Sequence, residues 1–387
     1  MSEWKEYRYT DLCSLIGGGT PKTSEPTYWG GNIPWLSVKD FGNDEKYVYK
    51  TEKTITENGL NNSSTKLLQK DDIIISARGT IGAIAMLASE MAFNQSCFGI
   101  RSNELVEQQY LYYLTKTKIT ELQKNSHGSV FDTITRDTFS QIICYIPPID
   151  TQRRIASILS SLDSKIAVNK KICENLEAQA QALFKHWFVD FAPFKDGKFV
   201  ESELGPIPEG WRVGDLSEFC NIKYGKGLEK NKLSSEGYPV FGGNGIIGFY
   251  NKYLYELPQI LVSCRGAASG KIIESYPHSY VTSNSLVLEM KDRSYYNYLK
   301  FNLLEMPLYM YATGSAQPQI TIDNIKGVKI IFPELSVVQK VNPIFSVIGD
   351  NLWKNTQESS RLSTLRDTLL PKLMSGEIKA NEIEKSL

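Results

Sequence analysis

The sequence predicts an α/β protein with two globular modules joined by two long antiparallel coiled-coil helices, in a pseudo-twofold internal repeat. Three observations predict this fold class. Sequence motifs of the first half recur in the same order in the second half, each half ends in a long run with coiled-coil spacing, and each module mixes strand-like apolar runs with helical stretches. Two equivalent helices in one chain pair most simply in opposite directions, with one module toward each end of the pair.

The internal repeat is carried by motifs that keep their order and spacing in the two halves. The segment GSVFDTITRD at Gly128–Asp137 returns as GSAQPQITID at Gly314–Asp323. The segment SARG at Ser76–Gly79 returns as SCRG at Ser263–Gly266, with nearly the same shift along the chain. Most of the intervening residues differ, so the repeat indicates two copies of one module whose surfaces have diverged.

Each half closes with a strand-like run, IICYIPP or VKIIFPE, followed by a long helical pattern. Mostly apolar residues alternate by steps of four and three along 155–187 and again along 341–373, which is the spacing of a coiled-coil seam. Asp150 is the expected N-cap of the first helix. In the second helix we expect Pro343 in the first turns and a bend or an end at Pro371. The seam residues expected to set helix register are Leu162, Ile166, Asn169, Leu176, Ile348, Leu352, Asn355 and Leu362.

The separation in sequence between Asn169 and Asn355 equals that between Gly128 and Gly314. The two asparagines therefore occupy equivalent seam positions. A buried Asn in a seam costs stability but fixes the register and the choice of partner. For either residue alone, a partly solvated seam position is an equal alternative. Their coincidence favours the role in register.

The composition divides the chain into five segments. Residues 191–210 are rich in Pro and Gly and have no hydrophobic period, so they are expected to form a linker. The other expected segments are a globular module at 1–149, a long helix at 150–190, a second module at 211–333 and a C-terminal long helix at 334–387. Within the modules we expect strands at 72–76, 260–263 and 285–288 and a helix at 108–124.

Composition excludes several classes of protein. Lysine plus arginine and aspartate plus glutamate number 43 each, which argues against binding to nucleic acid mainly by bulk charge attraction. No apolar run approaches the roughly 18 residues of a membrane span, and the N-terminal residues lack the core of a signal peptide. The six cysteines form no C-x-x-C pair and the three histidines lie far apart, so neither a metal site nor a disulfide framework is expected. We expect a reduced, cytoplasmic protein that does not contact a membrane.

Two motifs suggest an enzyme, and the context of each argues against it. GGNGIIG at Gly242–Gly248 contains the G-x-G-x-x-G spacing of a dinucleotide-binding loop. Such a loop must open a helix, and the residues that follow this motif show no helical pattern. A tight turn of the backbone is the favoured interpretation. NIPW at Asn32–Trp35 resembles the catalytic motif of amino-methyltransferases, in which the Asn and the aromatic residue engage a flipped base. A structural turn is favoured there as well, because no S-adenosylmethionine-binding pattern accompanies it.

The repeated S-x-R-G motif places Arg78 and Arg265 in loops at strand ends, where a guanidinium can contact guanine or phosphate. A salt bridge or a carbonyl contact within the module is the slightly favoured alternative. The loops that differ between the halves are rich in Gly, Lys, Thr, Ser and Asn, which hydrogen-bond bases and phosphates. For any one of these residues, an ordinary exposed loop position is the alternative. The candidate nucleic-acid contacts are Thr20, Lys22, Thr23, Lys39, Arg78, Ser126, His127, Lys226, Lys230, Lys232, Gly243, Asn244, Arg265, Gln317 and Gln319.

These segments resemble the specificity subunits of type I DNA restriction–modification systems. The resemblance covers nearly the whole chain and is carried by stereotyped segments, namely GGTP…YWGGNIPWLSVKD, ITENGLNNSSTKLL…DDIIISARGTIG, PPIDTQRRIASILSSLDSKIAVNKK…LEAQAQALFKHWFVDF, SELGPIPEGW, YPVFGGNGIIGFY and LRDTLLPKLMSGEIK. The two prolines of the second helix depart from the pattern of the first helix.

The resemblance implies that each module is a target recognition domain for one half of a bipartite, asymmetric site in double-stranded DNA. It implies that the helices set the half-site separation and dock two methyltransferase subunits, to which restriction and translocase subunits are added. Catalysis would belong to those partners, together with S-adenosylmethionine, ATP and Mg, so no active site, metal or cofactor is expected in this chain. The alternatives are a stand-alone DNA adenine-N6 methyltransferase and a scaffold that binds only protein.

Overall fold

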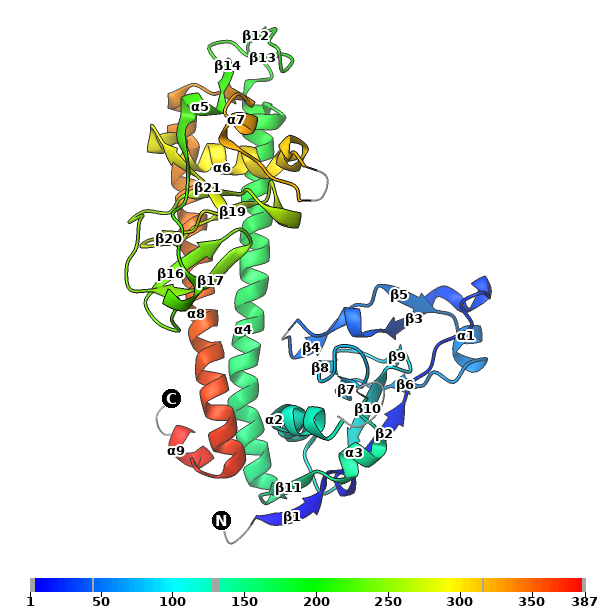
Figure 1. Cartoon of the computed structure of the whole chain (residues 1–387). Coiled ribbons are helices and arrows are strands. Elements are labelled where there is room, and N and C mark those ends of the chain that lie inside the picture. Colours follow the sequence, from blue (N-terminus) through cyan, green and yellow to red (C-terminus); the bar gives the residue numbers. More distant parts are fainter. Residues whose placement is uncertain (1–3, 44, 127–132, 315–316, 385–387) are drawn as a thin grey trace. The chain divides into compact units, whose positions relative to one another are not determined.

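The computed structural model describes residues 4–43, 45–126, 133–314 and 317–384, and the chain divides into two compact units (Figure 1). Unit 1 comprises Met1–Lys171 and Asn355–Leu387, and unit 2 comprises Ile172–Lys354. Each unit therefore contains one globular module and a part of both long helices. Among the described residues, no helix has the length and apolar character that crossing a bilayer requires.

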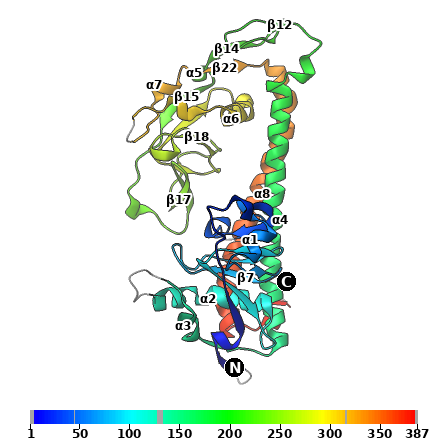
Figure 2. The same cartoon turned by 90° about the vertical axis from the view of Figure 1, so that its right-hand side faces the viewer.

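The two long helices are α4 (Ile149–Phe184) and α8 (Leu335–Ser375), which lie side by side in Figure 1 and overlap in the turned view of Figure 2. In unit 1 the Asn169 amide donates to Glu358 at 2.8 Å. In unit 2 the Cys173 thiol approaches the Leu352 carbonyl oxygen at 3.9 Å. Partners on α8 move toward its N-terminus as residue numbers rise on α4, so the predicted antiparallel pairing is confirmed.

The predicted seam is confirmed at all of its positions. The residues that step by four and three along 155–187 and along 341–373 are buried or half-buried. Between them, the middle of α4 from 164 to 179 is exposed at every position off the seam. Such a narrow buried stripe is the pattern of a helix that packs chiefly against one other helix.

One expectation about the helix ends was wrong. Asp150 lies inside the first turn of α4 and not at its N-cap, and its carboxylate pairs with Arg153 at 3.3 Å. Pro343 lies in the third turn of α8, within its expected first turns, and the helix continues past Pro371 for one turn to Ser375. A proline removes one hydrogen bond from a helix. Around Pro371 that loss is offset because Leu370, Leu373 and Met374 are buried in the core of unit 1.

The module of unit 1 contains a five-stranded sheet of order β2-β10-β7-β8-β4, a four-stranded sheet of order β5-β3-β9-β6 and the pair β1–β11. Its strands are β1 (Lys5–Arg8), β2 (Cys13–Gly17), β3 (Trp29–Leu36), β4 (Tyr47–Val48), β5 (Lys53–Ile55), β6 (Leu67–Leu68), β7 (Ile73–Ser76), β8 (Ile84–Leu87), β9 (Met91–Phe93), β10 (Cys97–Ser102) and β11 (Ile143–Ile146). Its shorter helices are α1 (Glu57–Asn61), α2 (Gln108–Ser126) and α3 (Arg136–Ser140), and α9 (Ala380–Glu384) follows α8.

The module of unit 2 repeats this plan with a four-stranded sheet of order β15-β21-β18-β19, a three-stranded sheet of order β17-β16-β20 and the pair β14–β22. A further hairpin, β12–β13, lies in the segment expected to be a linker. The strands are β12 (Phe199–Val200), β13 (Ile207–Pro208), β14 (Arg212–Asp215), β15 (Cys220–Tyr224), β16 (Tyr238–Gly242), β17 (Gly245–Tyr250), β18 (Ile260–Ser263), β19 (Ile272–Glu274), β20 (Tyr280–Val281), β21 (Ser285–Met290) and β22 (Lys329–Phe332). The helices are α5 (Leu216–Phe219), α6 (Tyr296–Glu305) and α7 (Ile322–Ile325).

The strands expected at 72–76, 260–263 and 285–288 are confirmed as β7, β18 and β21, and the helix expected at 108–124 is confirmed as α2. In the repeated IT motif, Thr135 and Thr321 accept hydrogen bonds from the backbone of α3 and α7 as helix N-caps. This part of the repeat therefore serves local structure, because an N-cap satisfies an amide that the helix itself cannot bond.

A buried polar network joins the module of unit 1 to both long helices. The Asp163 carboxylate on α4 accepts hydrogen bonds from Arg366 on α8 at 2.8 Å and from the Tyr113 hydroxyl on α2 at 2.5 Å. The Lys46 ammonium donates to the Ser160 hydroxyl of α4 at 2.7 Å, and burial lowers the pKa of Lys46 to about 8. Charged groups that are buried and mutually paired favour one arrangement of the elements that carry them.

Replacing Arg366 by Met should destabilise unit 1, because the side chain of Asp163 is only 8% exposed and would lose its cationic partner. We expect a loss of about 3 kcal/mol in the free energy of unfolding, measured by denaturant titration. The double variant Asp163→Leu, Arg366→Met removes both charges and should recover at least half of that loss. A single variant as stable as the parent chain would contradict this role of the network.

Candidate DNA interface

In each module the two repeated motifs contact each other at the end of the central strand. In unit 1 the Ile134 amide donates to the Ala77 carbonyl at 3.0 Å, and Arg78 forms an isolated β-bridge with Thr133. In unit 2 the Ile320 amide donates to the Cys264 carbonyl at 3.0 Å, and Arg265 forms the same bridge with Gln319. Repeated motifs that lie far apart in each half are thus joined by equivalent backbone bonds. We refer to this arrangement as the arginine junction.

The turn that follows each arginine has the same backbone conformation. Gly79 has a φ of 74° and Gly266 a φ of 75°, values that glycine adopts without strain. A Cβ atom built on either glycine would have no atom of the protein within 4 Å. The glycines therefore permit the turn and leave open space beside each arginine.

The arginine side chains are exposed and have no hydrogen bond or ion pair with any residue in the described ranges. The favoured alternative, in which Arg78 and Arg265 are anchored by salt bridges or carbonyl groups of their own modules, is not found there. A guanidinium has five N–H donors, and these are left for solvent or for a ligand.

A second equivalence concerns the ends of strands β3 and β16, which are followed by different residues in the two modules. The Leu36 carbonyl at the end of β3 accepts from the Asn94 amide, and the Phe241 carbonyl in β16 accepts from the Thr282 amide, both at 2.9 Å. Lys39 is the third residue after Leu36, and Asn244 is the third residue after Phe241. This position, the strand-exit residue, is a lysine within the 3-10 helix Val38–Asp40 in one module and an asparagine within a two-residue turn in the other.

In unit 1 this position borders a hollow of about 500 Å³, which is lined by Lys39, Arg78 and Lys53 together with Ser37, Asn94 and Ser96. The lysines and the arginine supply three cationic groups. Asp40 also lies at this hollow, where its carboxylate accepts hydrogen bonds from the Ser37 amide and hydroxyl and from the Glu52 amide. The structure thus brings two predicted contacts, Lys39 and Arg78, into one concave site.

In unit 2 Gly243 and Asn244 form the two-residue turn between β16 and β17. A Cβ on Gly243 would lie 3.0 Å from the Ser263 hydroxyl, so this turn packs against the strand that leads to Arg265. The Lys271 ammonium donates to the Asn244 side-chain oxygen at 2.7 Å. The favoured interpretation of GGNGIIG as a tight turn is confirmed, because strand β17 follows it where a dinucleotide-binding loop requires a helix.

The segment NIPW was expected to be a turn, and this was wrong. It lies in strand β3, paired with β5. The Trp35 ring is buried, and its indole N–H donates to the Gly19 carbonyl at 3.1 Å. The ring therefore serves as a core residue and is not placed to engage a flipped base.

With the geometry established, known proteins identify the family. A family model described as the type I restriction modification DNA specificity domain matches residues 1–178 and 208–359. The chain belongs to this family.

Two relatives span nearly the whole chain. The type I restriction enzyme MjaIX specificity subunit of Methanocaldococcus jannaschii is 29% identical over 98% of this chain and 95% of the relative. The HindI specificity subunit of Haemophilus influenzae is 23% identical over 98% of this chain and its own full length. The crystal structure of an S subunit from M. genitalium has a TM-score of 0.63 and 18% identity over 96% of both chains, which shows a shared fold.

Gly18 and Gly225 begin the loops that differ between the two modules, and both have a structural role. A Cβ on Gly18 would lie 2.1 Å from the Asn94 carbonyl oxygen, and one on Gly225 would lie 2.3 Å from that of Thr282. Both glycines directly follow equivalent edge strands, β2 and β15. The close approach of two backbones therefore requires glycine there in both modules.

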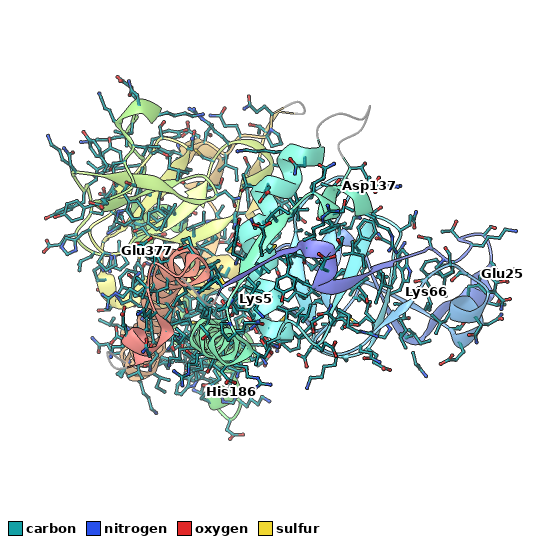
Figure 3. All side chains as sticks on the ribbon, turned by 90° about the horizontal axis from the view of Figure 1, so that it is seen from below. Lys5, Glu25, Lys66, Asp137, His186 and Glu377 are labelled. Carbon is teal, nitrogen blue, oxygen red and sulfur yellow. The ribbon has the colours of Figure 1, made fainter. Side chains whose placement is uncertain are left out.

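The other predicted contacts in the first loop of unit 1 are not among the residues that line its hollow. The Thr20 hydroxyl donates to the Gln95 side chain, whereas Lys22 and Thr23 are exposed. The same loop carries Glu25, which Figure 3 shows on the side of unit 1 remote from α4. Of the remaining candidates in this module, Ser126 is the last residue of α2, and His127 lies outside the described residues.

In the second module Lys226, Lys230 and Lys232 are exposed, and Lys232 pairs with Glu229 at 3.4 Å. Lys232 also borders a separate hollow of about 480 Å³ that includes Tyr280. The structure brings Gly243, Asn244, Arg265 and Gln319 into one region, with Gln317 exposed near its edge.

Sequence reasoning missed two lysines at these sites. Lys53 and Lys271 begin or precede strands that are distant in sequence from the divergent loops, so composition of the loops could not reveal them. No group of three or more His, Cys, Asp or Glu residues able to hold a metal ion occurs within the described part of the chain.

At the helix pair, Asn169 is fully buried, and its amide donates to Glu358, which also pairs with Lys165 at 3.3 Å. The hydrogen bond from Asn169 lowers the pKa of Glu358. The Asn169 side-chain oxygen has no partner among the described residues. A seam Asn bound in this way favours the register that aligns it with Glu358.

Replacing Gly18 by Ala should destabilise unit 1 by about 1–3 kcal/mol, because the new methyl group would overlap the Asn94 carbonyl. Thermal unfolding measures the change. Gly17→Ala is the matched control, since a Cβ there meets no atom within 4 Å. Equal melting temperatures for the two variants would contradict the close-approach role of Gly18.

Proposed function

We propose that this chain is the DNA specificity subunit of a type I restriction–modification complex and that each module recognises one half of a bipartite, asymmetric site. The recognition domains are proposed at 1–149 and 211–333. One observation carries the proposal: the two modules hold the same arginine junction but differ near it, with Lys39 lining a hollow with Arg78 in one module and the Gly243–Asn244 turn packing against Ser263 in the other. Two readers with one framework and different contact residues suit a DNA site whose halves differ.

The helices at 150–190 and 334–387 are proposed to set the distance between the half-sites and to dock two methyltransferase subunits. Residues on their outer faces, including Val168 and Val347, are at least half exposed and large enough to pack against another protein. Restriction and translocase subunits would join that core. The complex would act in the cytoplasm.

Catalysis is proposed to belong to the partner subunits, which would bind S-adenosylmethionine, ATP and Mg. The charge balance supports this division of labour, since a chain with equal numbers of acidic and basic residues gains its affinity for DNA largely from the assembled complex. The buried Trp35 argues against the alternative of a stand-alone adenine-N6 methyltransferase.

The function is tested by co-expressing the chain with methyltransferase subunits and mapping methylated adenines across the host genome. We expect methylation at one bipartite sequence with two different halves. The purified chain alone, incubated with DNA and labelled S-adenosylmethionine, should transfer no methyl groups. Turnover by the chain alone would contradict the subunit assignment, and failure of the chain to bind DNA in the assembled complex would favour a protein scaffold.

Asn244→Ala should relax or weaken recognition in one half-site and leave the other half unchanged, because Asn244 lies in unit 2 alone. Lys39→Ala is the matched variant in unit 1 and should affect the opposite half. A lost bidentate contact to a base costs about 1–3 kcal/mol, which corresponds to roughly 5- to 150-fold in binding. Methylation mapping of both variants gives the readout. A change in the same half-site for both would contradict the assignment of one module to one half.

A further inference from the structure

We propose that Arg78 and Arg265 contact backbone phosphates in the two half-sites and do not select bases. This inference rests on the proposed function, and it assigns the two arginines a different task from Lys39 and Asn244. It accounts for an arginine that is shared by two modules whose other exposed loop residues differ.

Backbone hydrogen bonds fix the point at which both arginines leave the framework. The residue before each one is bonded on both sides: the Ala77 amide donates to the Ser96 carbonyl at 2.8 Å, and the Cys264 amide donates to the Asn284 carbonyl at 3.0 Å. Their carbonyl groups accept from the repeated IT segment, as described above. Each arginine thus leaves the framework at the same point, which favours a contact with a feature common to both half-sites. The phosphate backbone is such a feature, whereas the bases differ.

Both guanidinium groups are exposed and available to bind a ligand. Neither side chain has a polar partner within the described residues, and the following glycines leave their surroundings open. A guanidinium can form two parallel hydrogen bonds to phosphate oxygens. In unit 1 the hollow is lined by Lys39 and Lys53 beside Arg78 and by the carboxylates Asp40 and Glu52, so its cationic groups outnumber its acidic groups.

The shared arginines contrast with the strand-exit residues, which are Lys39 in one module and Asn244 in the other. A contact that selects bases must differ between modules that recognise different half-sites, and the strand-exit residue does differ. A contact that positions the duplex carries no sequence information and can be kept. The arrangement therefore pairs a shared phosphate contact with a variable base contact in each module.

The test uses the assembled complex of the full chain with its methyltransferase subunits. Binding of the parent and of Arg78→Ala and Arg265→Ala is measured by fluorescence anisotropy over a range of KCl concentrations. The DNA duplexes are the cognate site and sites with one base changed in either half. Each variant should bind roughly tenfold more weakly, by the same factor on every duplex. The slope of log K against log salt should become shallower by about one.

Two further variants separate charge from structure. Arg78→Lys and Arg265→Lys keep a cation and should retain the parental salt slope. Thermal unfolding of the alanine variants should match the parent, because the side chains make no polar contact in the described fold. Lys39→Ala and Asn244→Ala serve as contrasts, since they should change the factor between cognate and substituted duplexes.

Parental affinity and slope in the alanine variants would overturn the inference, and so would altered base preference in methylation mapping. If the parent complex itself fails to distinguish the bipartite site from unrelated DNA, the proposed function is wrong. If the parent distinguishes the site but the arginine variants behave as the parent does, only the phosphate contact is wrong.

Discussion

Both modules depend on one backbone constraint, which is the double hydrogen bonding of the residue at the end of the central strand. Ala77 and Cys264 each donate to a neighbouring strand segment and each accept from the repeated IT segment. Pairing on both sides leaves the backbone no freedom at that point. The arginine and glycine that follow are therefore held in the same place in two modules whose loops differ in length and composition.

The long helices meet the modules through different chemistry in the two units. In unit 1 a buried network of Asp163, Arg366 and Tyr113 joins the module to both helices. In unit 2 the corresponding contacts are aromatic, with Phe301 stacked on Phe345 at a ring separation of 4.8 Å. Buried charges make an arrangement specific, whereas aromatic packing contributes mainly through burial of apolar surface. Between the modules and the long helices, the repeat thus preserved the topology and not the side-chain contacts.

Periodicity predicted the helix pair well, because a narrow stripe of mostly apolar residues can be buried in only one way. It did not show that the helix continues for one turn past Pro371, where the neighbouring leucines pack in the core of unit 1. It also failed at the NIPW segment, since only the fold shows that Trp35 is buried next to Gly19. The hollow of unit 1 joins Lys39, Lys53 and Arg78 from three separate strands or turns, and no local pattern specifies such an encounter. The repeated arginines could be found from the sequence, but their lack of internal partners could not.

Residues that the two modules share and residues that differ between them have separate roles, so recognition can change while the fold is kept. Glycines such as Gly18 and Gly225 must be kept because a methyl group would overlap a carbonyl of the framework. Lys39 and Asn244 are exposed, and each follows a strand that is held by an equivalent backbone bond. Substitution at this position therefore alters the chemistry presented to a ligand without altering the fold. A module built in this way can acquire a new target while its packing against the helices stays the same.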